Sequence, residues 1–156
     1  MEQHEAITEI LNDLVKINND RIEGYQKAIN ESKDLDIDLK ATFESMIQES
    51  KGYKDELINK VHEHGGEVED DTTSAGKIYR AWMNIKSTFT NSDRHSILES
   101  CEFGEDAAQR AYEAALSADS LLDDDCRKII SAQQASLSKS HELIKKQRDV
   151  HESLKQ

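Results

Sequence analysis

Glu105 is an acidic residue on an otherwise apolar helical face, because Ala108 and Tyr112 follow it three and seven positions later. Residues at these spacings share one face of an α-helix, and that face normally packs into the core. A carboxylate in a helical core can bind a metal ion, or it can accept hydrogen bonds from other buried polar groups. These two alternatives lead to different functions, so the residues that could surround Glu105 decide between them.

Hydrogen-bond donors for Glu105 are available on the inward faces of the other helices that the sequence predicts. Asn18, Ser50, Gln133 and Ser140 interrupt apolar stripes, and tyrosines lie one or two turns away. Buried polar atoms need partners, and this set can supply them. We therefore expect a buried polar layer that consists of Asn18, Tyr25, Ser50, Tyr53, Glu105, Tyr112 and Gln133.

Three other groups contain residue types that can bind a cation, cap a helix or react as a thiol. His62 and His64 are two positions apart, so they do not share a helical face, and we expect them to cap a helix C-terminus. The acidic run 67–71 lacks the ligand spacing of a calcium loop and is expected to be a solvated loop. Cys101 is expected to be a buried structural thiol, since the neighbouring carboxylate of Glu102 disfavours a thiolate.

Four long helices must position these residues. The first is predicted over 5–31, with an inward stripe of Leu11, Leu14, Asn18, Ile22, Tyr25 and Ile29. The second is predicted over 36–64 and is stopped by Gly65 and Gly66. The third follows Ser92 as its N-cap, and the fourth starts near Ser120 and continues to the C-terminus.

The two halves of the chain resemble each other at a constant offset of 87 residues. Asn18 then matches Glu105, Tyr25 matches Tyr112, and "LDIDLK" at 35–40 parallels "LDDDCR" at 122–127. One offset that holds over two helices and the turn between them indicates a duplicated helical hairpin. We therefore predict an all-α four-helix bundle, formed as one domain over 1–156 from a hairpin at 5–64 and a hairpin at 92–154.

The connector at 65–91 is long for a bare loop. A crossover along the bundle explains its length, because the second helix would span ~40 Å at 1.5 Å per residue. The connector is predicted to contain a short helix whose apolar face packs on the bundle or on a second subunit. That face consists of Ile78, Trp82, Ile85 and Phe89.

Several stretches of the chain carry a family resemblance. They are "AWMNIKS" at 81–87, "ILESCEFGEDAAQRAYEAAL" at 97–116 and, more weakly, "HELIKKQRD" at 141–149. With them the chain resembles a bacterial family of ferritin-like four-helix-bundle proteins with a domain of unknown function. The resemblance implies a ferritin-like fold, in which two hairpins are joined by a long crossover, and implies no established activity.

A ferritin-like di-iron centre takes a Glu from each of two helices and a Glu-x-x-His pair from each of the other two. Glu105 fits one single-Glu position, but its counterpart is Asn18. Residues 39–61 contain no histidine, and His141 has Ser138 three positions before it. We therefore expect no metal centre and no cofactor; if iron or manganese were bound, Glu105 and His141 would be the ligands.

Net charge, hydropathy and the cysteines limit the partners and the cellular location that we expect for the chain. The chain has 156 residues and a net charge of −12, so an anionic nucleic acid or membrane is not an expected partner. The N-terminus shows no secretory signal, and no apolar run is long enough to span a membrane. Two cysteines on different helices indicate free thiols in a reducing cytoplasm.

These observations favour a non-catalytic cytoplasmic bundle that acts through protein contacts, as a homodimer or with another protein. The ferritin-like resemblance adds the expectation of a role in a stress response. The alternative is a di-metal carboxylate oxidase, or an iron-handling protein, with a degenerate or intersubunit site.

Overall fold

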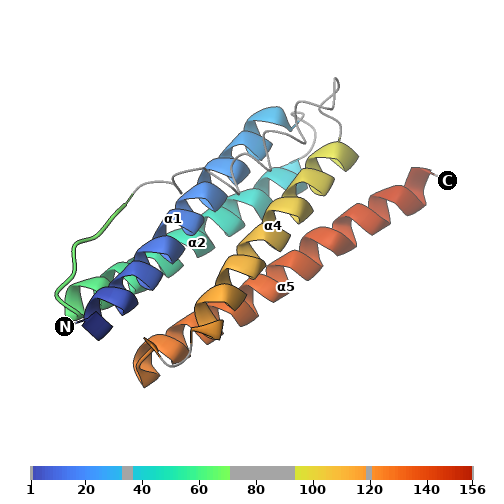
Figure 1. Ribbon diagram of the computed structural model, residues 1–156. Helices are drawn as coiled ribbons and strands as arrows, with labels where there is room; N and C mark the ends of the chain where they lie inside the picture. The colour runs from blue at the N-terminus through green and yellow to red at the C-terminus, as the bar shows by residue number, and fades with distance from the viewer. Residues whose placement is uncertain (1, 33–36, 71–93, 119–120, 156) are drawn as a thin grey trace.

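The computed structural model describes residues 2–32, 37–70, 94–118 and 121–155. These residues form four long helices and no strand (Figure 1). The helices are α1 (Glu2–Glu31), α2 (Ile37–Glu63), α4 (Arg94–Ser117) and α5 (Asp124–Lys155). The prediction of an all-α protein with four long helices is therefore confirmed for this part of the chain.

Helices α1 and α4 are neighbours that run in opposite directions. Arg21 of α1 contacts Glu105 of α4, whereas the earlier residue Asn18 contacts the later residue Tyr112. Each helix also packs against its sequence neighbour, α1 against α2 and α4 against α5. The first hairpin therefore lies against the second through α1 and α4 (Figure 1).

Helices α2 and α5 also lie side by side in opposite directions. Thr42 contacts Gln147, and further along α2 the side chain of Glu49 contacts Ser140. Because α1 is antiparallel to both α2 and α4, these two helices run in the same direction. The C-terminal end of α2 and the N-terminal end of α4 consequently lie at opposite ends of the bundle (Figure 1).

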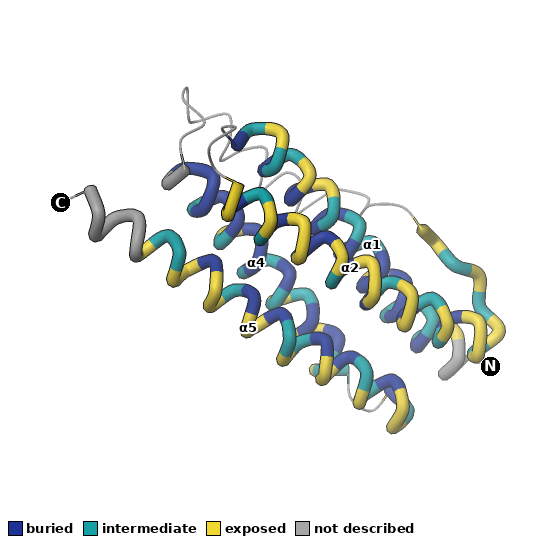
Figure 2. The backbone as a smooth tube through the Cα atoms, turned by 180° about the vertical axis from the view of Figure 1, so that it is seen from behind, coloured by how far each residue is buried: buried dark blue, intermediate teal, exposed yellow. Residues whose placement is uncertain are grey.

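The buried residues face one another between the four helices (Figure 2). The inward stripe of α2 is buried from Leu39 to Val61, that of α4 from Leu98 to Ala115, and that of α5 from Cys126 to Ile144. In α1 the predicted stripe is wrong at two positions, because Ile22 and Ile29 are only partly buried. The preceding residues, Arg21 and Ala28, take the inward positions. Because Arg21 and not Ile22 faces inward, the core contains a basic group.

Helix α2 ends at the two glycines that the sequence predicts. Gly65 has a φ of 71°, a left-handed conformation that glycine adopts without strain. The N–H of Gly66 donates to the carbonyl of Val61 at 3.0 Å, and the N–H of Gly65 donates to that of His62 at 3.0 Å. This pair of bonds is a Schellman motif, which satisfies the last carbonyls of the helix.

Helix α5 begins four residues later than its predicted start near Ser120. The carboxylate of Asp123 accepts a hydrogen bond from the N–H of Cys126 at 2.8 Å, so Asp123 is the N-cap. Asp124 and Asp125 then occupy the first turn, where negative charge is favourable. Ser120 itself lies outside the described residues, as does Ser92.

The acidic segment after α2 runs back along α1 as a loop in which Glu67, Glu69 and Asp70 are exposed, as expected of a solvated loop. Asn12, buried in α1, donates to the carbonyl of Glu67 at 2.9 Å and accepts from the N–H of Glu69 at 3.0 Å. Lys16 forms an ion pair with Glu69 at 2.7 Å, and Lys54 forms one with Asp70 at 2.8 Å. The acidic side chains thus pair with lysines of α1 and α2.

Gly66 lies so close to α1 that a side chain there would collide with Thr8. A Cβ atom on Gly66 would lie 2.4 Å from Cγ2 of Thr8. We expect Gly66→Ala to lower the free energy of unfolding by about 1–3 kcal/mol, the usual penalty for overpacking. Urea denaturation measures it, and Gly66→Ala with Thr8→Ala should recover most of the loss. The control is Gly52→Ala, since a Cβ at Gly52 meets no atom within 4 Å; an equal loss there would contradict the steric explanation.

Two further expectations concern the connector and membrane-spanning helices. The short helix in the connector and its apolar face of Ile78, Trp82, Ile85 and Phe89 lie outside the described residues. None of the described helices is long and apolar enough to cross a membrane.

Candidate functional site

A buried ion pair between α1 and α4 lies at the centre of the bundle. Arg21 and Glu105 are 1% and 0% exposed, so water does not screen their charges. Nε of Arg21 donates to Oε1 of Glu105 at 2.5 Å, and Nη2 donates to Oε2 at 3.3 Å. Such a two-point contact between a guanidinium and a carboxylate is among the strongest hydrogen-bonded pairs in proteins.

The remaining donors of Arg21 are directed at α2. Nη1 donates to Oγ of Ser50 at 2.8 Å and, more weakly, to the carbonyl of Met46 at 3.4 Å. Nη2 also lies 2.9 Å from the carboxylate of Glu49, which is partly exposed. Glu49 in turn accepts a hydrogen bond from Ser140 of α5 at 2.9 Å. This network, the Arg21 network, therefore connects all four helices.

Tyr25 completes the surroundings of the carboxylate. Its hydroxyl donates to Oε1 of Glu105 at 2.8 Å, and its ring centroid lies 5.3 Å from the guanidinium carbon of Arg21. Burial and the charge of Glu105 raise the pKa of Tyr25 well above its usual value, so the hydroxyl stays protonated as a donor. Burial disfavours the charge on Arg21, but Glu105, Tyr25 and Glu49 together outweigh this effect and raise the Arg21 pKa.

A second, neutral network lies next to the first. The side-chain amide of Asn18 donates to the hydroxyl of Tyr112 at 2.8 Å, and this hydroxyl donates to Oε1 of Gln133 at 2.6 Å. Nε2 of Gln133 then donates to the backbone carbonyl of Tyr53 at 3.2 Å. Burial raises the pKa of Tyr112, so this hydroxyl is also a protonated donor at neutral pH. The Asn18 network likewise connects all four helices.

The two networks are related by the internal repeat of the chain. Adding 87 to Tyr25 gives Tyr112, and subtracting 87 from Glu105 gives Asn18. The contact between Tyr25 and Glu105 and the contact between Tyr112 and Asn18 are therefore equivalent contacts in the two halves. The two networks differ in charge, because the equivalent of Arg21 is Ala108. One network thus holds a carboxylate with a cation, and the other holds a neutral amide.

The residues predicted to form a polar layer are divided between these networks. Tyr25, Ser50 and Glu105 contact one another or Arg21, and Asn18, Tyr112 and Gln133 form the neutral chain. Tyr53 contributes its backbone carbonyl to the neutral chain, although the prediction concerned its side chain.

Arg21 was missed because Ile22 is the apolar residue at nearly the same helical position. One signal in the sequence points to it. A buried Glu105 requires a cation, and Arg21 lies three residues after Asn18 and four before Tyr25, on the same face.

The donor set at the bundle centre does not fit a di-iron centre. The carboxylates of Glu105 and Glu49 both contact the guanidinium of Arg21, a cation in the place where a metal ion would bind between them. His141 faces a different partner, since its Nε2 lies 2.7 Å from the carboxylate of Asp106. The carboxylates that would hold iron are thus already paired with a cation of the chain.

Cys101 is fully buried beside this layer and is a free thiol. Burial raises its pKa well above the usual value, and the charge of Glu105 adds to this effect. The carboxylate that disfavours the thiolate is therefore Glu105, and not Glu102 as the sequence suggests. Glu102 instead forms an ion pair with Arg148 of α5.

A comparison with protein-family models shows the family. The family model described as "Domain of unknown function (DUF2383)" matches residues 6–118, which include most of α1, all of α2 and α4, and both residues of the Arg21–Glu105 pair. No curated protein matches the chain.

Proposed function

The chain belongs to the DUF2383 family, a domain of unknown function, and we propose that it is a non-catalytic ferritin-like bundle that acts through protein contacts. The observation that carries this proposal is the buried pair of Arg21 and Glu105 at the bundle centre. A ferritin-like centre needs anionic oxygens that are free to hold a metal. In this chain the guanidinium of Arg21 holds them instead.

The arrangement of the helices supports the ferritin-like part of the proposal. Neighbouring helices are antiparallel and α2 runs parallel to α4, the directions that two hairpins joined by a crossover require. The equivalence of the two polar networks supports a duplicated hairpin. The association with a stress response rests on the ferritin-like resemblance.

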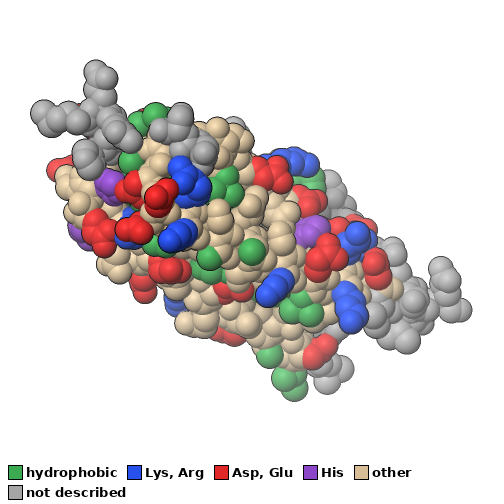
Figure 3. All heavy atoms as spheres, turned by 90° about the horizontal axis from the view of Figure 1, so that it is seen from below, with side chains coloured by type: hydrophobic (Ala, Val, Ile, Leu, Met, Phe, Trp, Pro, Cys, Tyr) green, Lys and Arg blue, Asp and Glu red, His purple; other side chains and the backbone are tan. Residues whose placement is uncertain are grey.

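The surface supports contacts with proteins of mixed charge. On the face in Figure 3, acidic and basic side chains alternate, and the hydrophobic ones are scattered in small patches. The large exposed apolar residues of the described part of the chain lie on three helices and one turn, and they are Ile37, Phe103, Leu121 and Leu143. We propose a homodimer or another protein chain as the partner, held by a largely polar interface.

Ferrous iron tests the non-catalytic part of the proposal. We expect the aerobic protein to oxidise Fe²⁺ no faster than buffer alone, because Arg21 neutralises and fills the centre. Absorbance of ferric products follows the reaction, and elemental analysis after desalting gives the bound iron. The melting temperature should also be insensitive to anaerobic Fe²⁺.

The matched variant is Glu105→Gln, which removes the carboxylate at constant shape. A saturable burst of oxidation with two irons per chain in the wild type, lost in Glu105→Gln, would refute the proposal and restore the di-metal alternative. Iron binding that is unchanged in Glu105→Gln would lie elsewhere on the protein and would leave the polar layer as described.

A further inference from the structure

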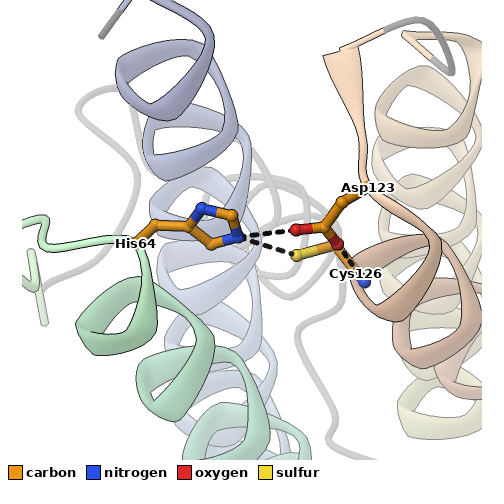
Figure 4. Close-up of side chains that lie close together, drawn as sticks. All are labelled: His64, Asp123 and Cys126. Carbon is orange, nitrogen blue, oxygen red and sulfur yellow. Dashed lines mark hydrogen bonds and ion pairs between the residues drawn. The ribbon is translucent and has the colours of Figure 1, made fainter.

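Three side chains with metal-binding atoms meet at one end of the bundle, far along α1 from the Arg21 network. His64 follows α2, Asp123 caps α5, and Cys126 lies in the first turn of α5 (Figure 4). Nε2 of His64 lies 2.8 Å from Oδ2 of Asp123 and 3.7 Å from Sγ of Cys126. All three donor atoms lie within 4.8 Å of one another.

The capping role predicted for His64 does not account for these contacts. The Schellman motif already satisfies the end of α2 through the backbone of Gly65 and Gly66. The imidazole is instead directed across the gap between the two hairpins, toward the N-terminus of α5 (Figure 4). These side-chain contacts of His64 therefore join the end of α2 to the second hairpin.

The geometry differs from that of a Cys–His–Asp catalytic triad. In a triad the base contacts the nucleophile through one ring nitrogen and the orienting carboxylate through the other. Here the thiol and the carboxylate both converge on Nε2 of His64 (Figure 4). The groups of a triad follow one another along a line, whereas the ligands of a metal ion converge on one point. The arrangement seen here is therefore that of a metal site.

We propose that His64, Asp123 and Cys126 bind one Zn²⁺ ion, with solvent as the fourth ligand. Zn²⁺ takes imidazole nitrogen, carboxylate oxygen and thiolate sulfur at about 2.0–2.3 Å, which places tetrahedral ligand atoms about 3.3–3.6 Å apart. The observed 3.7 Å between sulfur and nitrogen is close to this spacing. The 2.8 Å between nitrogen and oxygen must lengthen by a few tenths of an ångström, which a turn of the Asp123 side chain provides.

The other groups at the site are compatible with the ion. Oδ1 of Asp123 caps α5 while Oδ2 faces His64, so the cap and the metal bond use different oxygens. Binding replaces the S–H bond of Cys126 by a Zn–S bond, and the thiol proton leaves to solvent. Asp123 is partly exposed, with 42% of its side chain accessible, and this side gives the ion and the solvent ligand access.

The site would clamp the two hairpins together. It joins the end of α2 to the start of α5, and these two helices are the least closely packed of the neighbouring pairs. A ligand that binds only the folded protein stabilises it in proportion to the logarithm of its concentration. Zinc should therefore raise the melting temperature of the full chain.

Cobalt substitution tests the site directly, because tetrahedral Co²⁺ with a thiolate ligand has a sulfur-to-metal charge-transfer band and strong visible bands. We expect the full-length protein, freed of metal by a chelator, to develop these bands with one Co²⁺ per chain and to lose them when Zn²⁺ is added. Native mass spectrometry should then show one zinc per chain. A wild-type protein without a thiolate band would overturn the proposal, whatever the variants do.

Matched variants locate the ligands. Cys126→Ser should abolish the charge-transfer band, and Asp123→Asn, which keeps the N-cap, should weaken zinc binding by ~10-fold or more. Cys101→Ser and His62→Gln are controls that should keep both the band and the affinity. A band that disappears in Cys101→Ser, or survives in Cys126→Ser, would refute the assignment. Glu105→Gln should bind zinc like the wild type, so this outcome is separate from that of the iron experiment.

Discussion

Replacing Arg21 by Met should lower the free energy of unfolding by about 3–5 kcal/mol, the usual effect of removing one partner of a buried ion pair. Methionine fills much of the same volume but has no donors. Of its present side-chain partners, Glu105 would then keep only the Tyr25 hydroxyl. Ser50 would also lose the guanidinium that donates to it. Urea denaturation at neutral pH measures the loss.

The double variant Arg21→Met with Glu105→Leu separates lost charge pairing from lost packing. Replacing a whole buried ion pair by apolar residues is often neutral or stabilising, by up to about 4 kcal/mol. We therefore expect the double variant to be more stable than Arg21→Met alone and close to the wild type. Glu49 loses its contact with Arg21 in both variants, and its partial exposure allows water to solvate it.

A different result would assign another role to the pair. If the double variant were no more stable than Arg21→Met, the loss would come from the packing of the long Arg21 side chain. The control is Lys16→Met, which removes a cation of α1 from an ion pair with the exposed side chain of Glu69. Such a surface pair contributes about 0–1 kcal/mol, so Lys16→Met should change stability little.

The helices could be predicted from the sequence because their stripes are long and regular. In α4 the inward residues recur every three or four positions from Leu98 to Ala115, and all of them are buried. Gly65 and Gly66 gave a correct stop, since a left-handed residue after a helix is a local requirement. The start of α5 was less certain because Ser120 and Asp123 are both good N-cap residues, and only the hydrogen bond to Cys126 distinguishes them.

The polar core could be predicted only in part. Helical periodicity places Glu105 and Asn18 inside, but it does not decide whether Arg21 or Ile22 occupies the inward position, because the two are adjacent on the helix. Hydrophobicity favours Ile22, and charge balance around Glu105 favours Arg21. The structure follows charge balance, since an unpaired buried carboxylate is more costly than a partly exposed isoleucine.

The cluster at the end of the bundle had no signal in the sequence. His64 and Cys126 are 62 residues apart, and they meet only because α2 ends beside the start of α5. No periodicity relates a residue after one helix to the cap of another. The spacing of ligands along the chain identifies a metal site only where a local turn or a single helix holds them.

The repeat leads to a second large expected effect, at Asn18. Replacing Asn18 by Glu would give the first half the same carboxylate as Glu105 in the second half. Glu105 is paired with Arg21 away from water, whereas the position equivalent to Arg21, beside Tyr112, holds the apolar residue Ala108. We expect Asn18→Glu to lower the free energy of unfolding at pH 8 by about 3–5 kcal/mol, because it buries a charge without a cation.

The pH dependence identifies the cause of this loss. Burial without a cation raises the pKa of the new carboxyl in the folded state above its unfolded value near 4.3. The penalty is therefore small below the unfolded pKa, grows as the pH rises, and is complete above the folded pKa. The stability difference between Asn18→Glu and the wild type should widen from pH 4 to pH 8 in urea titrations. Asn18→Gln, which is neutral and of similar size, should show a smaller loss that does not change with pH. An equally pH-independent loss in Asn18→Glu would mean that a carboxylate in the Asn18 network needs no cation of its own.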